Sequence, residues 1–469
     1  MKQIRNIAIN LASIEIWPIG LLVAASFISS RLLPVALVIA ALFWLIRWLA
    51  YGKLSLRTPA DWPVFLLFLM VPVTLWATSL LEITVTQVYR LLTGITIFYA
   101  IANWTTTTRR LRLLTTGVVA TGLILALSAP LSVTWPTGKL PFIPASLYSR
   151  FTVIVSDTIH PNVLAGSLVI LLQIPLAWLF FSWRSINRWQ RLLAIVADTI
   201  HPNVMAGSLV ILLPIPLAWL FFSWRVIKGW QRLLAIAAVL GMSSVLILTK
   251  SRGAWMAFAL ALVFMILLRW RWGWVSILVG GLAGGIGVYI LGFNTLIDFL
   301  LRSDTIGGVD GRIEVWSRAI YMIQDFPFTG IGMGTFTKVA DTLYPFFTAS
   351  PGQVAHAHNL FLQIAVDLGI PGLIAWLAVL LLGVTQAWQV YRLGKGVEDA
   401  FTTGLGAGLL VSQLALIVHG MTDAVTWGMV KPAPLVWVVW GLAIAGGNIY
   451  RNLMKNEQAQ PVQFLDKVK

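Results

Sequence analysis

The sequence predicts an all-α fold: a polytopic bundle of about 12 membrane-spanning helices with one large outer loop between late spans. Three observations predict it. The 469 residues are 58% hydrophobic and only 11% charged, with a mean hydropathy of +0.86, whereas a soluble domain is about 25% charged. Apolar runs of the roughly 20 residues that a spanning helix needs recur along the whole chain. One long polar interruption, residues 294–361, separates them late in the sequence.

The composition excludes several classes of protein. The net charge of +16 does not indicate nucleic acid, because most Lys and Arg residues lie between apolar runs, where they orient membrane helices. The chain has no cysteine, so a disulfide framework and a Cys-ligated metal site are excluded. We therefore expect a multi-pass protein of the inner (cytoplasmic) membrane whose surroundings are membrane lipids.

The first half of the chain alternates spans with basic connections. Lys2 and Arg5 predict a cytoplasmic N-terminus, and Arg109 and Arg110 mark the same side again after the fourth span. Prolines in 134–161 favour irregular backbone at the outer surface. The expected spans here are 14–30, 32–50, 63–81, 85–103 and 113–133.

A tandem duplication follows. Residues 157–197 and 198–238 align without gaps at an offset of 41 and differ at six positions. Each copy carries one span-length apolar run, but the connection at 192–202 rises only about 16 Å as a helix, too short to recross about 30 Å of hydrocarbon. We expect one copy to span and the other to be re-entrant, interfacial or displaced; the sequence does not say which.

The basic residues that follow the duplication favour a topology in which only one of the two copies crosses the membrane, so that the later spans keep their orientation. Arg269, Arg392 and Arg451 then lie inside, while the loop 294–358 and the connection that contains His419 and Asp423 lie outside. We expect one membrane domain over 1–450 and a polar C-terminal tail over 451–469. The expected late spans are 233–249, 253–268, 274–293, the run that ends near 388, 401–418 and 433–450.

Two arginines at the outer side are candidate anion ligands. A guanidinium binds phosphate through two hydrogen bonds and keeps its charge. Arg252 could equally be an interfacial residue that reaches into the headgroups, and Arg312 could form a surface ion pair with Glu314 or Asp310. Arg312 opens an amphipathic segment, on which Arg318 falls roughly 240° away by the helical period, so both are not expected at one ligand. Ile313, Trp316, Ile320 and Ile323 share one face of that segment.

His358, at the start of the next apolar run, is the candidate catalytic residue, because imidazole can accept a proton from a sugar hydroxyl. A capping role at the interface is the alternative. Asn359, His356, Arg318 and Asp423 are weaker candidates. The glycines at 330, 332 and 334 indicate a tight turn, since no strand precedes them and no Lys-Ser/Thr follows. No acidic pair or histidine cluster has metal-ligand spacing, so we expect neither a metal nor a cofactor.

Several short motifs occur in a fixed order around the outer loop. They are Ser251-Arg252-Gly253, Gly311-Arg312 with Trp316, Pro327–Gly334, His358-Asn359-Leu360-Phe361 with Gly369-Ile370, and the His-Pro-Asn triplets at 160–162 and 201–203. Over roughly 150–425 this set resembles the O-antigen ligase and polymerase family. The resemblance implies a GT-C-like helical fold and a metal-independent glycosyltransferase of lipopolysaccharide or polysaccharide biosynthesis.

The resemblance also implies substrates and roles. Members transfer a glycan from an undecaprenyl diphosphate carrier, on the periplasmic side, to an acceptor hydroxyl such as that of lipid A-core. Arg252 and Arg312 would bind the diphosphate, and His358 would activate the hydroxyl. Neither the sugar nor the choice between ligase and polymerase follows from the sequence. The duplication departs from the family's pattern beside the expected site.

Two other functions compete with the enzyme. A transporter of a bicarbonate-like anion could use the same arginines, and a flippase of lipid-linked glycan would place charges along a central cavity. The candidate residues cluster at one membrane face, and the repeat is a direct copy instead of an inverted half. Both points favour the enzyme.

Overall fold

The computed structural model describes residues 2–21, 33–132, 202–291, 309–428 and 433–459. All regular structure in these ranges is helical, as the sequence predicts. The helices are α1 (Lys2–Ser13), α3 (Leu33–Tyr51), α4 (Asp61–Ala77), α5 (Leu81–Trp104), α6 (Thr108–Ser132), α11 (Pro202–Leu212), α12 (Pro214–Phe222), α13 (Gly229–Leu248), α14 (Arg252–Arg269), α15 (Gly273–Leu291), α17 (Val309–Asp325), α18 (Phe336–Leu343), α19 (Leu360–Gly396), α20 (Ala400–Gly420) and α21 (Ala433–Ala459).

Ten stretches of these helices are long and apolar enough to cross a membrane, and α4 is a shorter apolar helix. α11 and α12 together form one such stretch. The chain is thus a polytopic helical bundle. Most predicted spans coincide with one of these helices. The predicted span at 14–30 falls partly outside the described residues and the first repeat copy, 157–197, falls wholly outside them, so the figure of about 12 spans is not tested.

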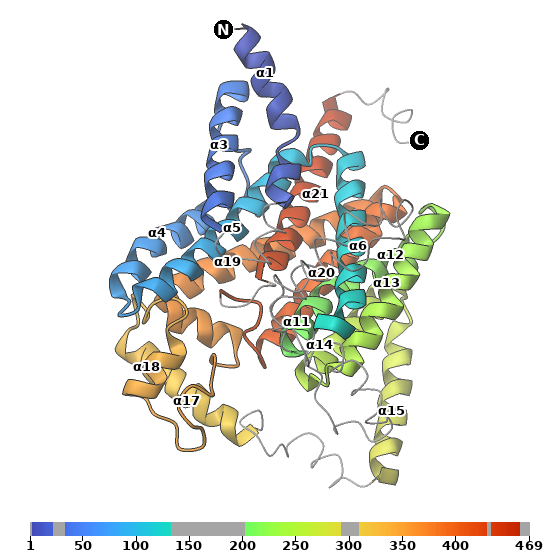
Figure 1. The fold of residues 1–469 in the computed structure, drawn as a ribbon. Helices are drawn as coiled ribbons and strands as arrows, with labels where there is room; N and C mark the ends of the chain where they lie inside the picture. Colours follow the sequence, from blue (N-terminus) through green and yellow to red (C-terminus); the bar gives the residue numbers. More distant parts are fainter. Residues whose placement is uncertain (1, 22–32, 133–201, 292–308, 429–432, 460–469) are drawn as a thin grey trace, which may run out of the picture.

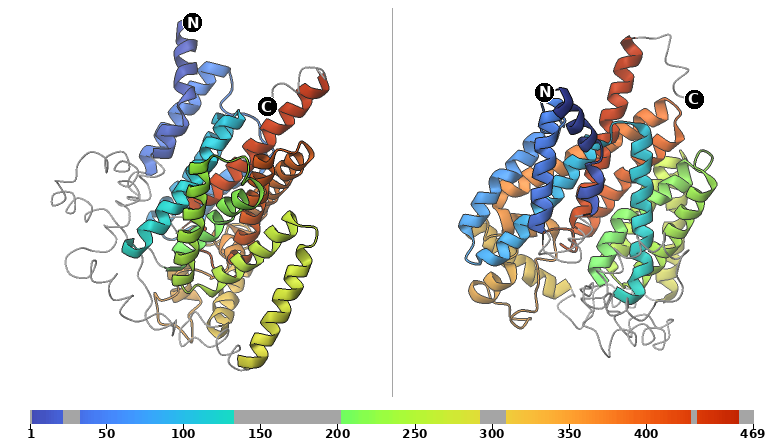
Figure 2. Two further views of the ribbon diagram at one scale, coloured as in Figure 1. Left: turned by 90° about the vertical axis from the view of Figure 1, so that its right-hand side faces the viewer. Right: turned by 45° about the horizontal axis from the view of Figure 1, so that its top comes forward.

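The beginning of the chain lies at the end of the bundle opposite residues 309–359, which we call the outer segment. α1 and the C-terminal end of α21 lie at one end, and α17 and α18 lie at the other, as Figures 1 and 2 show from three directions. The predicted topology, with the loop 294–358 across the membrane from the N-terminus, requires such an arrangement. Large aromatic side chains fill the middle of the bundle, among them the fully buried Trp219, Trp376, Trp440 and Phe98.

Within the duplication, the described copy is the second, and it is built into the bundle as α11 and α12. The hydroxyl of Ser412 on α20 donates to the carbonyl of Ile211 at 2.5 Å. The hydroxyl of Ser223 donates to the carbonyl of Ala400, where α20 begins, at 2.8 Å. Pro214 begins α12 and separates it from α11. This copy therefore packs as an integral part of the core; the first copy, 157–197, lies outside the described residues.

α19 is kinked near the outer end of the bundle, and the glycine-rich turn at 329–334 packs against the kink. Gly369 has φ 70° and ψ −179° inside the helix, and the next amide, of Ile370, donates to the carbonyl of Pro327 at 2.7 Å. A Cβ on Gly369 would lie 2.7 Å from the carbonyl carbon of Phe328. The tight, closely packed turn that the sequence predicts is confirmed, and glycine is needed because the backbones touch.

α17 and α18 form a small outer core of their own with the segment before α19. The buried members include Val315, Ala319, Met322, Phe336 and Ala357. The amphipathic helix predicted after Arg312 is present, but its inward face differs from the isoleucine face. Ile313 is 56% exposed and Ile320 is 44% exposed, whereas Val315, Ala319 and Met322 face inward, and Ile323 packs partly buried against them.

Candidate functional site

The segment that leads into α19 is fixed by its capping residue. Asn359 is the N-cap, and its side-chain oxygen accepts the backbone N–H groups of Phe361 and Leu362 at 3.0 and 3.1 Å. Its amide nitrogen also donates to the carbonyl of Met421 at 3.3 Å. Asn359, and not His358 as the sequence allowed, therefore caps α19, and it also ties this segment to the loop after α20. We call that loop, residues 421–428, the strap.

Asp423 on the strap is the centre of a polar cluster. Its side chain is only 3% exposed. One carboxylate oxygen lies 3.5 Å from Nε2 of His356, and the other accepts the side-chain amide of Asn203, on α11, at 3.0 Å. The backbone N–H of Ala424 donates at 2.8 Å to the same oxygen that faces His356. Residues from α11, the outer segment and the strap therefore meet at one carboxylate.

The two histidines before α19 differ in how their rings are held. Their ring centroids lie 4.4 Å apart. Nδ1 of His356 accepts the backbone N–H of His358 at 3.2 Å, and its Nε2 faces Asp423. Both nitrogens of His356 are thus engaged, so this ring is oriented by its neighbours. His358 itself has φ 48°, a left-handed conformation that is uncommon for residues other than glycine and is found at functional sites.

Burial and charge set the protonation of this cluster. Burial lowers the pKa of His356, the Asp423 carboxylate acts in the opposite direction, and the charge of Arg312 lowers it further. Burial alone would raise the pKa of Asp423, but His356, His419, His358 and the N–H of Ala424 together hold it below its usual range. At neutral pH we therefore assign a charged Asp423 and a neutral His356.

Arg312 and Arg252 lie close enough to interact with each other. Arg312 is in the first turn of α17, where burial lowers its pKa, Asp423 opposes this effect, and the charge of Arg252 adds to it. Nε of Arg312 is buried and makes no hydrogen bond within the described part of the chain. Arg252 begins α14, and the next residue, Gly253, packs against Thr422 of the strap. Two guanidinium groups thus converge at the strap, as a doubly charged anion requires.

Arg318 is not part of this arrangement. Its Nε donates to the carbonyl of Pro345 at 3.1 Å, and its guanidinium pairs with Glu314 at 3.6 Å. Glu314 accepts the N–H of Phe347 at 2.6 Å, and the structure shows no ion pair between Glu314 and Arg312. The helical period had predicted that Arg312 and Arg318 lie on different sides of their helix.

Two residues of the cluster were not among the sequence candidates. Asn203 was noted only as part of a triplet, and the structure shows it bonded to Asp423. His419 is buried, with neither ring nitrogen hydrogen-bonded to a described residue. It packs on Gly207, where a Cβ would lie 3.2 Å from its ring. No pattern in the sequence joins α11 to the strap, which lies more than 200 residues later.

A metal ion is a further occupant to consider. Ligand atoms of His356, His358 and Asp423 come within 4.8 Å of one another, a grouping that could hold a cation. The sequence spacing did not predict this trio, since Asp423 joins it only in three dimensions. Arg312 acts electrostatically on both His356 and Asp423, and its positive charge opposes a second cation in the same place.

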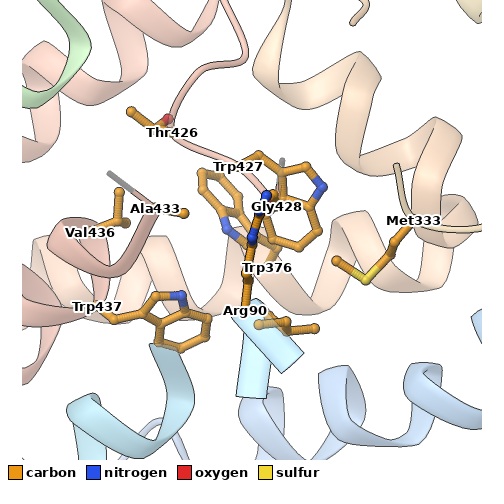
Figure 3. A pocket seen from close by; sticks show the side chains of 10 residues that line it. Arg90, Met333, Trp376, Thr426, Trp427, Gly428, Ala433, Val436 and Trp437 are labelled. Atoms are coloured by element: carbon orange, nitrogen blue, oxygen red, sulfur yellow. The ribbon is translucent and has the colours of Figure 1, made fainter. Parts of the chain in front are cut away.

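The other end of the strap borders a small aromatic cavity. Figure 3 shows Arg90 among the rings of Trp376, Trp427 and Trp437, with Met333 beside them. Nη1 of Arg90 donates to the carbonyl of Gly428 at 3.3 Å. The strap is thus held at both ends. Near its beginning Asn359 bonds to Met421 and Asn203 bonds to Asp423, and at its end Arg90 bonds to Gly428.

Part of the chain matches a known protein family. Residues 237–377 match the family model described as O-antigen ligase. The chain carries an O-antigen ligase domain. The resemblance noted in the sequence is confirmed, and the match includes Arg252, Arg312, His356 and His358. No curated protein matches the chain.

The O-antigen ligase domain covers a little under a third of the chain and ends inside α19. Asp423 and Asn203, which complete the cluster, lie outside it. The apolar helices identify an integral, multi-pass membrane protein, and the family match indicates a membrane glycosyltransferase of the O-antigen ligase or polymerase type.

Proposed function

We propose that this protein transfers a glycan from an undecaprenyl diphosphate carrier to an acceptor hydroxyl at the periplasmic face of the inner membrane. The observation that carries the proposal is the convergence of Arg252, Arg312, His356 and Asp423 at the strap, although they come from four separate segments. A diphosphate leaving group needs positive charge, and an attacking hydroxyl needs a base. The cluster offers both within one outer site.

The arginines bind the donor. As the glycosidic bond breaks, negative charge develops on the diphosphate, and two preorganised guanidinium groups stabilise it. The buried Nε of Arg312 has no hydrogen bond within the described residues, so it is a donor available to a phosphate oxygen. Burying such a group is costly unless a ligand completes it, which supports a binding role over a surface ion pair.

His358 is the base that accepts the proton of the acceptor hydroxyl. His356 is its supporting residue, because Asp423 and the backbone of His358 engage both its nitrogens. A general base of this kind contributes about 10²–10⁴-fold to the rate. Asn203 holds the carboxylate of Asp423 in position, and Asn359 ties the segment that carries the histidines to the strap.

The reaction needs no metal, because the arginines supply the positive charge at the leaving group. Adding a chelator such as EDTA should leave the transfer rate unchanged. Loss of transfer in EDTA, restored by a divalent cation, would instead assign the trio of His356, His358 and Asp423 as a metal site.

The acceptor separates a ligase from a polymerase, and both would use the same cluster. A ligase takes a lipid A-core hydroxyl, and a polymerase takes the end of another glycan chain. α17, which carries Arg312, lies at the end of the bundle opposite α1 (Figure 1). With the N-terminus in the cytoplasm, as the basic residues favour, the site faces the periplasm.

The test is transfer by purified protein of a radiolabelled glycan from undecaprenyl diphosphate to lipid A-core or to a glycan acceptor. We expect a labelled product with one of the two acceptors. No product with either acceptor, together with bicarbonate uptake in liposomes, would overturn the proposal and favour the transporter.

A further inference from the structure

We propose that Asp367 is a positioning residue that holds together the three segments of the transfer site. The inference rests on the proposed function for its catalytic consequence, but the geometry can be tested without it. Asp367 lies on α19, two residues before the kink at Gly369, and its side chain is 2% exposed. It is too deeply buried to touch the substrate.

Three N–H groups from three parts of the chain converge on this carboxylate. The indole N–H of Trp427, on the strap, donates to one oxygen at 2.8 Å. The side-chain amide of Gln363 donates to the other oxygen at 3.0 Å, and the backbone N–H of Gly334 donates to the same oxygen at 3.3 Å. All three contacts are buried.

Each contact leads to a segment that carries a site residue. Trp427 belongs to the strap, which carries Asp423. Gly334 ends the glycine-rich turn that follows α17, the helix of Arg312. The side-chain oxygen of Gln363 accepts the backbone N–H of Ala357 at 2.8 Å, and Ala357 lies between the two histidines. One buried carboxylate therefore fixes the strap, the outer turn and, through Gln363, the histidine segment.

The surroundings of Asp367 consist of donors, so only a group that accepts on both oxygens fits. An asparagine has the same shape but replaces one oxygen by an NH₂ group. In one orientation this group faces the indole N–H of Trp427, and in the other it faces Gly334 and Gln363. Either way at least one buried N–H loses its acceptor. The Asp367→Asn variant therefore loosens at least one of the three segments.

Exchanging the two polar groups should restore the network. In the double variant Gln363→Glu/Asp367→Asn, the amide at 367 donates to the carboxylate at 363 and its oxygen accepts from Trp427. The carboxylate at 363 still accepts from Ala357. Only the longest contact, from Gly334, is lost. Gln363→Glu alone places two carboxylates side by side, which is unfavourable.

The experiment measures kcat per folded molecule for the unmutated protein, both single variants and the double variant. Leaving a buried N–H without its acceptor corresponds to a fall of about 10- to 100-fold. We expect such a fall in each single variant and recovery of most of it in the double variant. The matched control is Asp341→Asn, because Asp341 accepts a single N–H, from Gly352 at 2.9 Å, which an amide oxygen accepts equally well.

A distance measurement keeps the test independent of activity. The chain has no cysteine, so spin labels can be placed on Phe347→Cys in the outer segment and Met421→Cys on the strap, both exposed positions. We expect a narrow distance distribution, a broader one with Asp367→Asn, and a narrow one again in the double variant. Unchanged distances and an unchanged kcat in Asp367→Asn would overturn the inference. If the unmutated protein transfers no glycan, the proposed function fails, while the spin-label distances still decide the role of Asp367.

Discussion

At the scale of single residues, the proposed glycan transfer depends on two neighbouring histidines that have different roles. His356 is engaged on both nitrogens by Asp423 and by the backbone of His358. The sequence pointed to His358 and Arg252, which lie beside apolar runs, and to Arg312, which opens an amphipathic segment of the outer loop. It could not rank Asp423 highly or find the role of Asn203, because their contact joins residues that are far apart in the chain.

The pH dependence of transfer follows from His356. Burial lowers its pKa below the ordinary value of about 6.5, so the neutral ring, whose Nδ1 accepts the N–H of His358, persists into mildly acidic solution. Protonation turns this acceptor into a donor and breaks the contact. We expect a flat rate between pH 8 and about 6.5 and a fall at lower pH, measured as kcat at saturating donor.

A variant checks the cause of this fall. The charge of Arg312 is one of the factors that lower the pKa of His356. Arg312→Gln should therefore move the acidic limb of the profile toward higher pH. A limb that stays in place or moves toward lower pH would show that the protonation of His356 does not control the rate.

At the scale of elements, the site depends on close contact between α19 and the glycine-rich turn. The three glycines predicted a tight turn, and the structure confirms it at the kink of α19. The sequence did not reveal which face of α17 packs inward. The isoleucines gave the stronger apolar pattern, but Val315, Ala319 and Met322 are the residues that pack inward.

Replacing Gly330 should be more harmful than replacing a glycine of similar backbone conformation elsewhere. Gly330 has φ 65°, and a Cβ there would lie 2.6 Å from the backbone of Asp367. Gly352 has φ 81° but nothing within 4 Å. Gly352→Ala should cost about 1–2 kcal/mol of backbone strain, and Gly330→Ala should cost a further ~1–3 kcal/mol from overpacking.

Thermal unfolding in detergent measures the difference between these two variants. We expect a clearly lower unfolding temperature for Gly330→Ala than for Gly352→Ala. Equal unfolding temperatures would mean that the turn does not pack against α19 as described.

At the scale of the whole molecule, composition was enough to predict a polytopic helical bundle, because an apolar run of about 20 residues has the length that a helix needs to cross a membrane. The duplication was the difficult part. Two nearly identical copies give the same local signals, so the sequence alone could not say which copy packs into the bundle. The structure shows the second copy in contact with α20 and with Asp423.

Deleting residues 157–197 should therefore leave the bundle and the site intact. The remaining copy keeps Asn203, Ile211 and Ser223 and all their described contacts. We expect the shortened protein to elute as a single folded species in detergent and to retain transfer. A shortened protein that aggregates, while the full chain does not, would show that the first copy also supports the fold.

The measurement that tests the central claim most directly separates donor binding from transfer. Donor affinity and kcat would be measured for the unmutated protein, Arg312→Ala and His358→Ala, with the amount of folded protein determined for each. The account predicts that Arg312→Ala weakens donor binding, whereas His358→Ala keeps donor affinity and loses about 10²–10⁴-fold in kcat. Full transfer by folded His358→Ala protein, or unchanged donor affinity in Arg312→Ala, would contradict it.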